Sequence, residues 1–256
     1  MRTKVEEFSQ YYEKWVTQLD LYLQRLVMAS TGITPPTEAE LRDLVSRLTT
    51  HHKGYYTEKW AAAQEDVLVF FSPAWATPLE NAYLWLTGWK PSTAFGLVAN
   101  LRKSGMALGS LSEEQVKRIE QLRMKIKYEE EKVDGEMERQ QVALADRRLV
   151  ELARLASRTT RINEHGGGVG GDGPTQVSGM VDVAVRSMAV GLERVMKAAD
   201  CVRLKTLKGL LDLMSPSQCV EFLAAISMLQ IRLRQCGQIR RRMMAQNIEI
   251  QPKLGM

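Results

Sequence analysis

The chain has 256 residues, of which 45% are apolar and 25% are charged, as in an ordinary globular protein. No apolar run approaches the roughly 18 residues that a transmembrane helix needs, and the N-terminal residues lack the apolar core of a secretion signal. The three cysteines, Cys201, Cys219 and Cys236, are widely spaced, so neither a disulfide framework nor a paired-cysteine zinc site is expected. We therefore expect a reduced, intracellular protein.

Basic residues concentrate toward the C-terminal end. Residues 161–256 hold 13 Lys and Arg against 8 Asp and Glu, whereas residues 1–100 hold 9 against 11. The excess lies in a short C-terminal segment rather than on a broad basic face, which is a weak electrostatic footprint for nucleic-acid binding.

Helical periodicity dominates the first hundred residues. Apolar residues recur every three or four positions over residues 8–26, which predicts a helix that ends at Gly32. Capping boxes at Thr37–Glu40 and Thr77–Glu80 mark two further helix starts, because in each box the two side chains bind each other's free backbone N–H groups.

The helix from Thr37 is expected to continue to Phe71, and the helix from Thr77 is expected to end at Gly88, with a short helix opening at Pro91. Ser112 with Gln115 caps a long helix that we extend to about Ser157, since apolar residues recur there about every 3.5 positions with charged residues between them.

Residues 159–179 interrupt this periodicity. They hold seven of the 18 glycines and one large apolar residue, Ile162, so we predict a flexible connector. Helical spacing resumes over residues 181–214, and residues 215–218 cap a final helix. No convincing strand alternation occurs, so we predict an all-α helical bundle, with a single domain over residues 1–245 and a tail at 246–256.

Gly166 to Gly171 fits the pattern G-x-G-x-x-G of dinucleotide-binding loops. That loop requires a preceding strand and a following helix N-terminus, which aim backbone N–H groups at the pyrophosphate. Here a charged helix precedes the glycines and Pro174 follows them, so we interpret the glycines as part of the connector. The sequence also lacks the GK[ST], HExxH and GxSxG motifs.

Three titratable residues, His51, His52 and Asp66, are candidates for chemistry. His51 and His52 are helical neighbours whose side chains diverge by about 100°, so they cannot chelate one metal ion from a single face. His52 falls on the apolar stripe and is expected at the edge of the core, with a role as a haem ligand or pH sensor as the alternative. Asp66 is expected to form one buried bond to an arginine, a lysine or an indole N–H.

Residues 71–89 are unusually rich in aromatic side chains. A platform for stacking bases would need interleaved cations, and Lys90 is the only one nearby. We expect a structural knot around tight turns, with an apolar ligand pocket or a partner groove as the alternative. The aromatic residues are Phe71, Trp75, Tyr83, Trp85 and Trp89.

A spaced set of motifs resembles the plant Delay of Germination (DOG) domain, which also forms the C-terminal part of TGA-type bZIP transcription factors. The resemblance covers about residues 5–240. Its motifs are Glu40-Leu-Arg-x-Leu-Val45, His52-x-x-Tyr55, Lys59-x-x-Ala62-Ala63-x-x-Asp66-Val67, Ser72-Pro-x-Trp75, Leu79-Glu80-x-Ala82-x-Leu84-Trp85-Leu86-x-Gly88-Trp89-x-Pro91-Ser92, Asp200-x-x-Arg203-x-x-Thr206-Leu207 and Ser217-Gln218-x-x-x-Phe222-Leu223.

The resemblance implies an all-α regulatory domain without catalytic activity. From the residues of this sequence we expect no bound metal or cofactor. Its signature core residues are Asp66, Trp75, Trp85, Gly88, Trp89 and Pro91. TGA factors carry a basic region and leucine zipper ahead of this domain, whereas here the first helix begins near Met1, so we expect a stand-alone member similar to the seed-dormancy regulator or the pollen-aperture protein. Haem binding in the dormancy regulator is attributed to late histidines, and none follows His165 here.

Three functions are compared. The first is a non-enzymatic interaction protein of plant development, in the nucleus and cytoplasm, which binds phosphatases, kinases or transcription co-regulators. The second is transcription-linked binding of DNA or a co-regulator, as in TGA factors. The third is a sensor with an acyl chain or haem in the bundle. Homodimer formation and peripheral association with the plasma membrane stay open.

The C-terminal arginines are the candidate contacts for a partner or nucleic acid. They lie on an amphipathic segment, and cations near a helix C-terminus are stabilised by the helix dipole even without a partner. The alternative is electrostatic docking of a calmodulin-like protein, an anionic membrane or nucleic acid. The residues are Arg232, Arg234, Arg240, Arg241 and Arg242.

Overall fold

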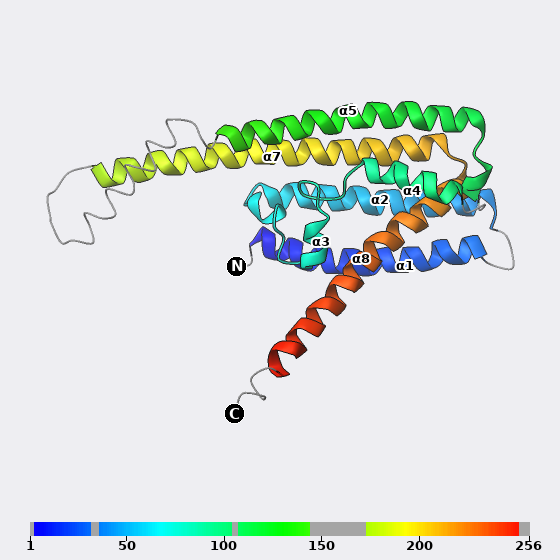
Figure 1. Ribbon diagram of the computed structural model, residues 1–256, viewed down its shortest axis with the longest axis horizontal. Coiled ribbons are helices and arrows are strands. Elements are labelled where there is room, and N and C mark those ends of the chain that lie inside the picture. The colour runs from blue at the N-terminus through cyan, green and yellow to red at the C-terminus, as the bar shows by residue number, and fades with distance from the viewer. Residues whose placement is uncertain (1–2, 32–35, 104–106, 144–172, 251–256) are drawn as a thin grey trace. The chain divides into compact units, whose positions relative to one another are not determined.

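The computed structural model describes residues 3–31, 36–103, 107–143 and 173–250, and helices make up most of these residues (Figure 1). In this part of the chain the one β-type pairing is an isolated bridge between Trp85 and Gly88. The all-α prediction is therefore confirmed. The helices are α1 (Lys4–Thr31), α2 (Glu38–Ala63), α3 (Pro78–Ala82), α4 (Ser92–Arg102), α5 (Glu113–Ala143), α7 (Gly173–Leu213) and α8 (Pro216–Ile250), with 3-10 turns η1 (Leu68–Phe70) and η2 (Ala107–Ser110).

The helix starts follow the capping predictions. At α3 the Thr77 hydroxyl accepts the backbone N–H of Glu80 at 3.2 Å, and Glu80 Oε2 accepts that of Thr77 at 2.6 Å. Thr37 and Glu40 form the same box at α2. Ser–Gln pairs form reciprocal bonds of the same kind at residues 112–115 and 215–218. These features are local in sequence, which is why they could be predicted.

Two helices are shorter than expected. Helix α2 ends at Ala63 rather than continuing to Phe71, because Asp66 Oδ1 accepts the backbone N–H of Leu68 at 2.9 Å and the chain turns into η1. Helix α3 ends at Ala82 rather than at Gly88, because Tyr83, at φ −103° and ψ 8°, already leaves the helical region, and Leu86 further along has a left-handed φ of 57°.

The predicted connector lies only partly within the described residues. Residues 144–157 of the predicted long helix and residues 159–172 of the connector lie outside them. Helix α7 begins at Gly173, so residues 173–179 are helical rather than flexible. Pro174 suits this helix start, because its fixed φ matches the first turn of a helix and its missing N–H needs no partner there.

The chain divides into two compact units, Met1–Glu130 with Ala199–Met256, and Glu131–Ala198. In the larger unit α1, α2 and α8 pack against one another, and α3, α4 and η2 pack on α8. Its fully buried side chains include Leu19, Leu26, Leu48, Phe222 and Leu223. In the smaller unit α5 and α7 run side by side, and a Cβ on Gly191 would lie only 2.1 Å from Gln140 Oε1 (Figure 1). A glycine at this position permits the close approach.

Within the described ranges, no helix is both long enough and apolar enough to cross a bilayer.

Candidate functional site

A buried carboxylate, Asp200 of α7, organises the centre of the larger unit. Its Oδ1 accepts from Lys59 Nζ at 2.9 Å and from Arg203 Nη1 at 2.6 Å, and its Oδ2 accepts from the Trp60 indole N–H at 2.9 Å. The Lys59, Asp200 and Arg203 side chains are at most 1% exposed. Charges removed from water to this degree need mutual pairing and full hydrogen bonding, and the cluster supplies both.

The two cations of this cluster also hold the loop of residues 85–89. Lys59 Nζ donates to the Thr87 carbonyl at 3.0 Å and to its hydroxyl at 2.8 Å. Arg203 donates through Nε to the Trp89 carbonyl at 2.7 Å and through Nη2 to the Trp85 carbonyl at 2.6 Å. The Arg203 guanidinium also lies 5.2 Å from the centre of the Trp85 ring. The loop conformation therefore depends on buried cations from α2 and α7.

The loop itself contains a sharp turn. Trp85 and Gly88 form a two-way backbone pair, with Trp85 N–H to the Gly88 carbonyl at 2.8 Å and the reverse bond at 3.3 Å. Leu86, between them, has a left-handed φ of 57°. A non-glycine residue in this region costs about 1–2 kcal/mol, so the surrounding bonds must hold it in place. Gly88 in turn permits the close approach of Arg203, because a Cβ at Gly88 would lie 2.9 Å from Arg203 Cζ.

The cluster carries one excess positive charge, because the two cations Lys59 and Arg203 pair with the single carboxylate of Asp200. Burial lowers the pKa of Lys59 to about 8, the adjacent Asp200 carboxylate opposes this effect, and Arg203 reinforces it. Lys59 nevertheless stays mainly protonated at neutral pH, and its three ammonium hydrogens match its three acceptors.

A second cluster forms around Arg234 of α8. Its Nη1 donates to the Trp75 carbonyl at 3.1 Å and to Glu80 Oε1 at 3.3 Å, and its Nη2 pairs with Glu13 of α1. The guanidinium lies 5.2 Å from the centre of the Tyr12 ring. Arg234 is 7% exposed, so it belongs to the folded core and the expectation of a partner contact does not hold for it.

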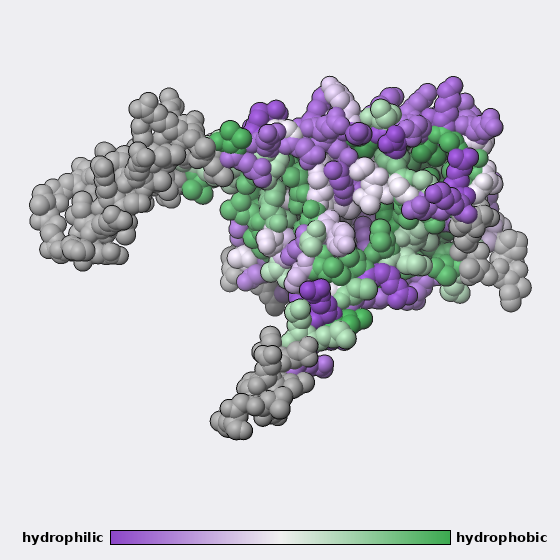
Figure 2. Space-filling view, in the orientation of Figure 1, coloured by the Kyte–Doolittle hydropathy of each residue, from purple (hydrophilic) through white to green (hydrophobic). Residues whose placement is uncertain are grey.

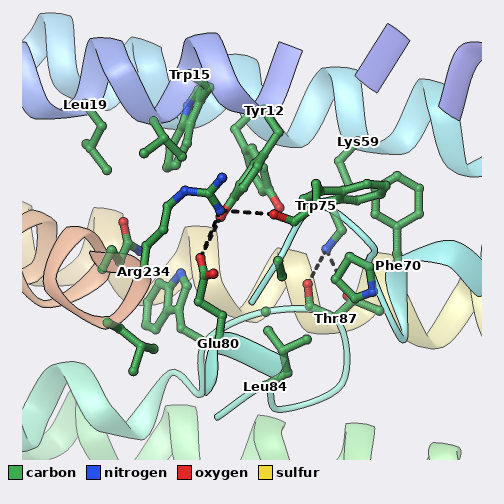
Figure 3. A pocket seen from close by; sticks show the side chains of 18 of the residues that line it. Tyr12, Trp15, Leu19, Lys59, Phe70, Trp75, Glu80, Leu84, Thr87 and Arg234 are labelled. Atoms are coloured by element: carbon green, nitrogen blue, oxygen red, sulfur yellow. Dashed lines mark hydrogen bonds and ion pairs between the residues drawn. The ribbon is translucent and has the colours of Figure 1, made fainter. Parts of the chain in front are cut away.

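A small cavity lies between the two clusters (Figure 3). Its volume is about 160 Å³, and all of its lining residues belong to the larger unit. Figure 3 shows Arg234 and Glu80 on one side of it and Lys59 with Thr87 on the other. Aromatic rings form much of the wall: Tyr12, Trp15, Tyr55, Phe70 and Trp75.

The two histidines differ in environment. His51 stacks on Trp15, with ring centres 5.0 Å apart and planes at 4°, and its Nε2 donates to the Trp15 carbonyl at 3.0 Å. His52 is buried and lines the cavity, and its Nε2 has no hydrogen-bond partner within the described part of the chain. Burial, with a smaller contribution from His51, lowers the pKa of His52 to about 4, so its ring is neutral at neutral pH.

These residues do not fit a haem. His52 offers a ring nitrogen, but its cavity of about 160 Å³ lies below the range of roughly 300–1,000 Å³ that is typical of pockets for drug-sized ligands, and haem is larger than such ligands. The Nε2 of His51 is already bonded, and His165 lies outside the described residues. Within those residues, no group of three or more His, Cys, Asp or Glu is arranged to hold a metal ion.

The signature residues named from the sequence separate into two groups. Gly88, Trp85 and Trp89 form the clamped loop, Trp75 lies at the Arg234 cluster, and Pro91 is buried at the start of α4. Asp66, in contrast, is exposed, and the expectation of a buried bond to a cation or indole is wrong for it, because its Oδ1 accepts the backbone N–H of Leu68 instead.

Asp200 makes the bonds that were expected of Asp66, to a lysine, an arginine and an indole. Its i,i+3 spacing to Arg203 within Asp200-x-x-Arg203-x-x-Thr206 was the available signal, since this spacing places two helical side chains side by side. The partners on α2, about 140 positions away in sequence, could not be identified from local patterns.

Together these features define an all-α protein in which two buried ion clusters hold a tryptophan-rich segment around a small cavity. The profile of the DOG1 family, described as "Seed dormancy control", matches residues 18–100. The chain is 54% identical over 238 residues to Protein DOG1-like 4 of Arabidopsis thaliana, covering 93% of this chain and 95% of that protein. The chain belongs to the DOG1 family.

Two further relatives show how widely the similarity extends. Protein ZW2 of Arabidopsis thaliana is 26% identical over 91% of this chain and 96% of its own length. Transcription factor TGA5 of the same plant is 28% identical over 89% of this chain and 62% of its own length. The predicted resemblance to the DOG family and to TGA factors is therefore confirmed.

Proposed function

We propose that this protein is a non-enzymatic regulator of plant development that acts by binding protein partners. The family description, "Seed dormancy control", and the extensive identity to DOG1-like 4 support a regulatory role. The charged groups of the site also support a non-enzymatic role, because Lys59, Asp200 and Arg203 are hydrogen-bonded to each other and to the loop of residues 85–89. They act as structural ties rather than as free acids, bases or nucleophiles.

The proposed partner contact is the exposed face of the C-terminal half of α8, which we call the α8 face. Apart from the adjacent pair Ile239 and Arg240, its residues recur every three or four positions, so the set falls on one side of the helix. Figure 2 shows apolar and hydrophilic residues side by side on this end of α8. All members of the α8 face are exposed: Leu229, Arg232, Cys236, Ile239, Arg240 and Met243.

The opposite side of the same helix is occupied by the protein itself. Arg234 binds the Trp75 carbonyl, and Arg241 Nη2 donates to the Ala76 carbonyl at 3.0 Å. A Cβ on Gly237 would lie 2.1 Å from Thr77 Oγ1, so the helix approaches the start of α3 closely. The helix is thus anchored on one side and presents arginines and apolar side chains on the other, which is the single observation that carries the proposal.

The chemistry of the α8 face favours an acidic protein with an apolar groove. Apolar anchors at helical spacing between cations are recognised by helix-binding grooves such as those of calmodulin-like proteins. Two arginines on the face are few for nucleic acid, whose affinity grows with the number of neutralised phosphates.

The test uses Ca²⁺-loaded calmodulin as a defined acidic probe, titrated by isothermal calorimetry at low and physiological salt. We expect binding that weakens with salt and that falls by about tenfold or more, about 1.4 kcal/mol, in the double variant Arg232→Glu with Arg240→Glu. The matched control, Lys117→Glu with Lys125→Glu, changes the net charge equally at exposed positions of α5 and should bind as the wild type does.

The proposal fails if both double variants lose affinity equally, because binding would then follow net charge alone. Parallel titrations with anionic vesicles and with duplex DNA at the same salt complete the test. If either of these binds more tightly than the acidic protein and depends on Arg232 and Arg240, the α8 face serves a membrane or nucleic acid instead.

A transcription-linked role is the second candidate, and the similarity to Transcription factor TGA5 favours it. That relationship also supports a nuclear location. In this reading the partner is a co-regulator rather than DNA. A tagged protein that stays in the nucleus and associates with chromatin only when a TGA factor is present would support the co-regulator role, whereas exclusion from the nucleus would contradict it.

A further inference from the structure

Two residues that line the cavity between the ion clusters each carry a buried polar atom without a hydrogen-bond partner in the described part of the chain. The residues are His52 and Gln230, and the atoms are His52 Nε2 and Gln230 Oε1. A buried polar atom without a partner costs about 1–3 kcal/mol, so such atoms are rare unless a water or ligand completes them.

The size of the cavity limits what can occupy it. At about 160 Å³ it is close to the volume of an apolar cavity of about 150 Å³ that takes up benzene. Pockets for drug-sized ligands are larger, roughly 300–1,000 Å³. One aromatic ring with a small substituent is therefore the largest compact ligand that fits without rearrangement.

The wall favours a ring over a flexible chain. Trp15, Tyr55, Phe70 and Trp75 line the cavity, and the native aromatic side chains already pair at the distances that rings prefer. Ring centres lie 4.9 Å apart for Trp15 and Tyr55 and 5.4 Å apart for Phe70 and Trp75. A bound ring could add offset or edge-to-face contacts of the same kind.

The charged groups of the lining argue against an acidic ligand. Lys59 donates to three acceptors, and Arg203 and Arg234 are bonded to carbonyls and carboxylates. A carboxylate in the cavity would find these donors already occupied. The unmatched atoms, in contrast, are one amide oxygen that accepts and one neutral ring nitrogen that accepts or donates according to the tautomer.

We propose that this cavity binds a small neutral phenol, in which the ring fills the aromatic pocket and the hydroxyl completes His52 Nε2 and Gln230 Oε1. The single hydroxyl proton goes to Gln230 Oε1, which can only accept, and the phenol oxygen accepts from His52 in the tautomer that carries its proton on Nε2. This site is separate from the α8 face, and the inference does not depend on the proposed function.

The test compares phenol with toluene, which has nearly the same shape but no hydrogen-bonding group. Binding to the full chain is measured at neutral pH by thermal shift and by tryptophan fluorescence, since Trp15, Trp75 and Trp89 line the cavity. In a purely apolar cavity toluene binds better, because phenol must leave its water partners. We expect phenol to bind about fivefold more tightly than toluene, since it gains bonds to buried polar atoms.

Two histidine variants identify the group responsible. His52→Phe keeps an aromatic ring but removes the nitrogen, and it should reverse the preference so that toluene binds more tightly than phenol. His51→Phe is the matched control, because His51 does not line the cavity, and it should preserve the preference for phenol. Ala76→Leu, which narrows the cavity, should abolish binding of both compounds.

Several results would overturn the proposal. Absence of binding by either compound would show that the cavity takes no ligand of this class. Equal or tighter binding of toluene to the wild type, or an unchanged preference in His52→Phe, would remove the role of the histidine. Tighter binding of decanoate than of phenol would identify the cavity as part of an acyl-chain site. The histidine variants keep the test decisive even if Ala76→Leu fails to fold.

Discussion

A side chain on Gly88 would collide with the guanidinium of Arg203, because a Cβ built on Gly88 would lie 2.9 Å from Arg203 Cζ. The guanidinium cannot retreat freely, since it is bonded to Asp200 and to the carbonyls of Trp85 and Trp89. The glycine and the arginine, 115 positions apart in sequence, therefore form one structural unit.

The first prediction concerns this contact. We expect Gly88→Ala to destabilise the protein by about 1–3 kcal/mol, measured by chemical denaturation, because an added methyl group overpacks a site that cannot relax. Gly96→Ala is the matched control, since a Cβ there has no neighbour within 4 Å and the position is an exposed one in α4. The control should stabilise the helix by about 0.5–1 kcal/mol. Equal effects at the two glycines would show that the loop accommodates the methyl group.

The second prediction concerns Asp200. Asp200→Asn removes the one carboxylate that pairs with Lys59 and Arg203 inside the protein, so two buried cations lose their counterion. We expect a loss of about 3–5 kcal/mol in unfolding free energy, or an insoluble protein. Asp212→Asn, which breaks an exposed pair with Lys208, should change stability by less than about 0.5 kcal/mol. If Asp200→Asn keeps the melting temperature of the wild type, the cluster does not stabilise the fold.

Local signals and long-range contacts differ in how well they could be predicted from this sequence. The caps at Thr37, Thr77, Ser112 and Ser215 are confirmed, because each depends on residues three positions apart. The apolar pattern predicts ends of α2 and α3 that lie too far along the chain, because it does not reveal the turn at Asp66 or the backbone conformations of Tyr83 and Leu86.

The site shows the same division. The tryptophan-rich segment is predicted to be a structural knot. Arg203 binds the carbonyls of Trp85 and Trp89, and Arg234 binds that of Trp75. The ions that clamp it were not identified, because Lys59, Asp200 and Arg203 meet only through tertiary packing. Arg234 resembled the exposed arginines near it in sequence, and only the packing of α8 against α1 and α3 buries it.

The third prediction concerns pH. The pKa of His52 in the folded protein is about 4, against an ordinary value of 6.5, so below pH 6.5 the unfolded chain binds a proton that the folded protein does not. The contribution of His52 to stability is therefore complete above pH 6.5 and is lost as the pH falls from 6.5 toward 4. The full loss amounts to about 3 kcal/mol at most.

Denaturation curves of the wild type and His52→Phe at several pH values test this expectation. The wild type should lose more unfolding free energy than the variant between neutral and acidic pH. Per pH unit, the difference should grow by no more than the uptake of one proton by the unfolded chain allows. Some acid sensitivity should remain in the variant, because burial also lowers the pKa of His51. Parallel curves for the two proteins would show that His52 takes up its proton equally in both states.

The last prediction separates the two carboxylates of the Arg234 cluster. Glu80 is buried with Arg234, whereas the Glu13 side chain is 57% exposed. Solvent weakens the exposed pair, so a double-mutant cycle of Arg234→Met with Glu80→Gln should give a coupling of about 1–3 kcal/mol. The cycle of Arg234→Met with Glu13→Gln should give less than about 1 kcal/mol. Because Glu80 also caps α3 through the Thr77 N–H, the cycle is needed to separate the ion pair from the cap. A larger coupling for Glu13 than for Glu80 would mean that Arg234 holds α8 mainly to α1 rather than to α3.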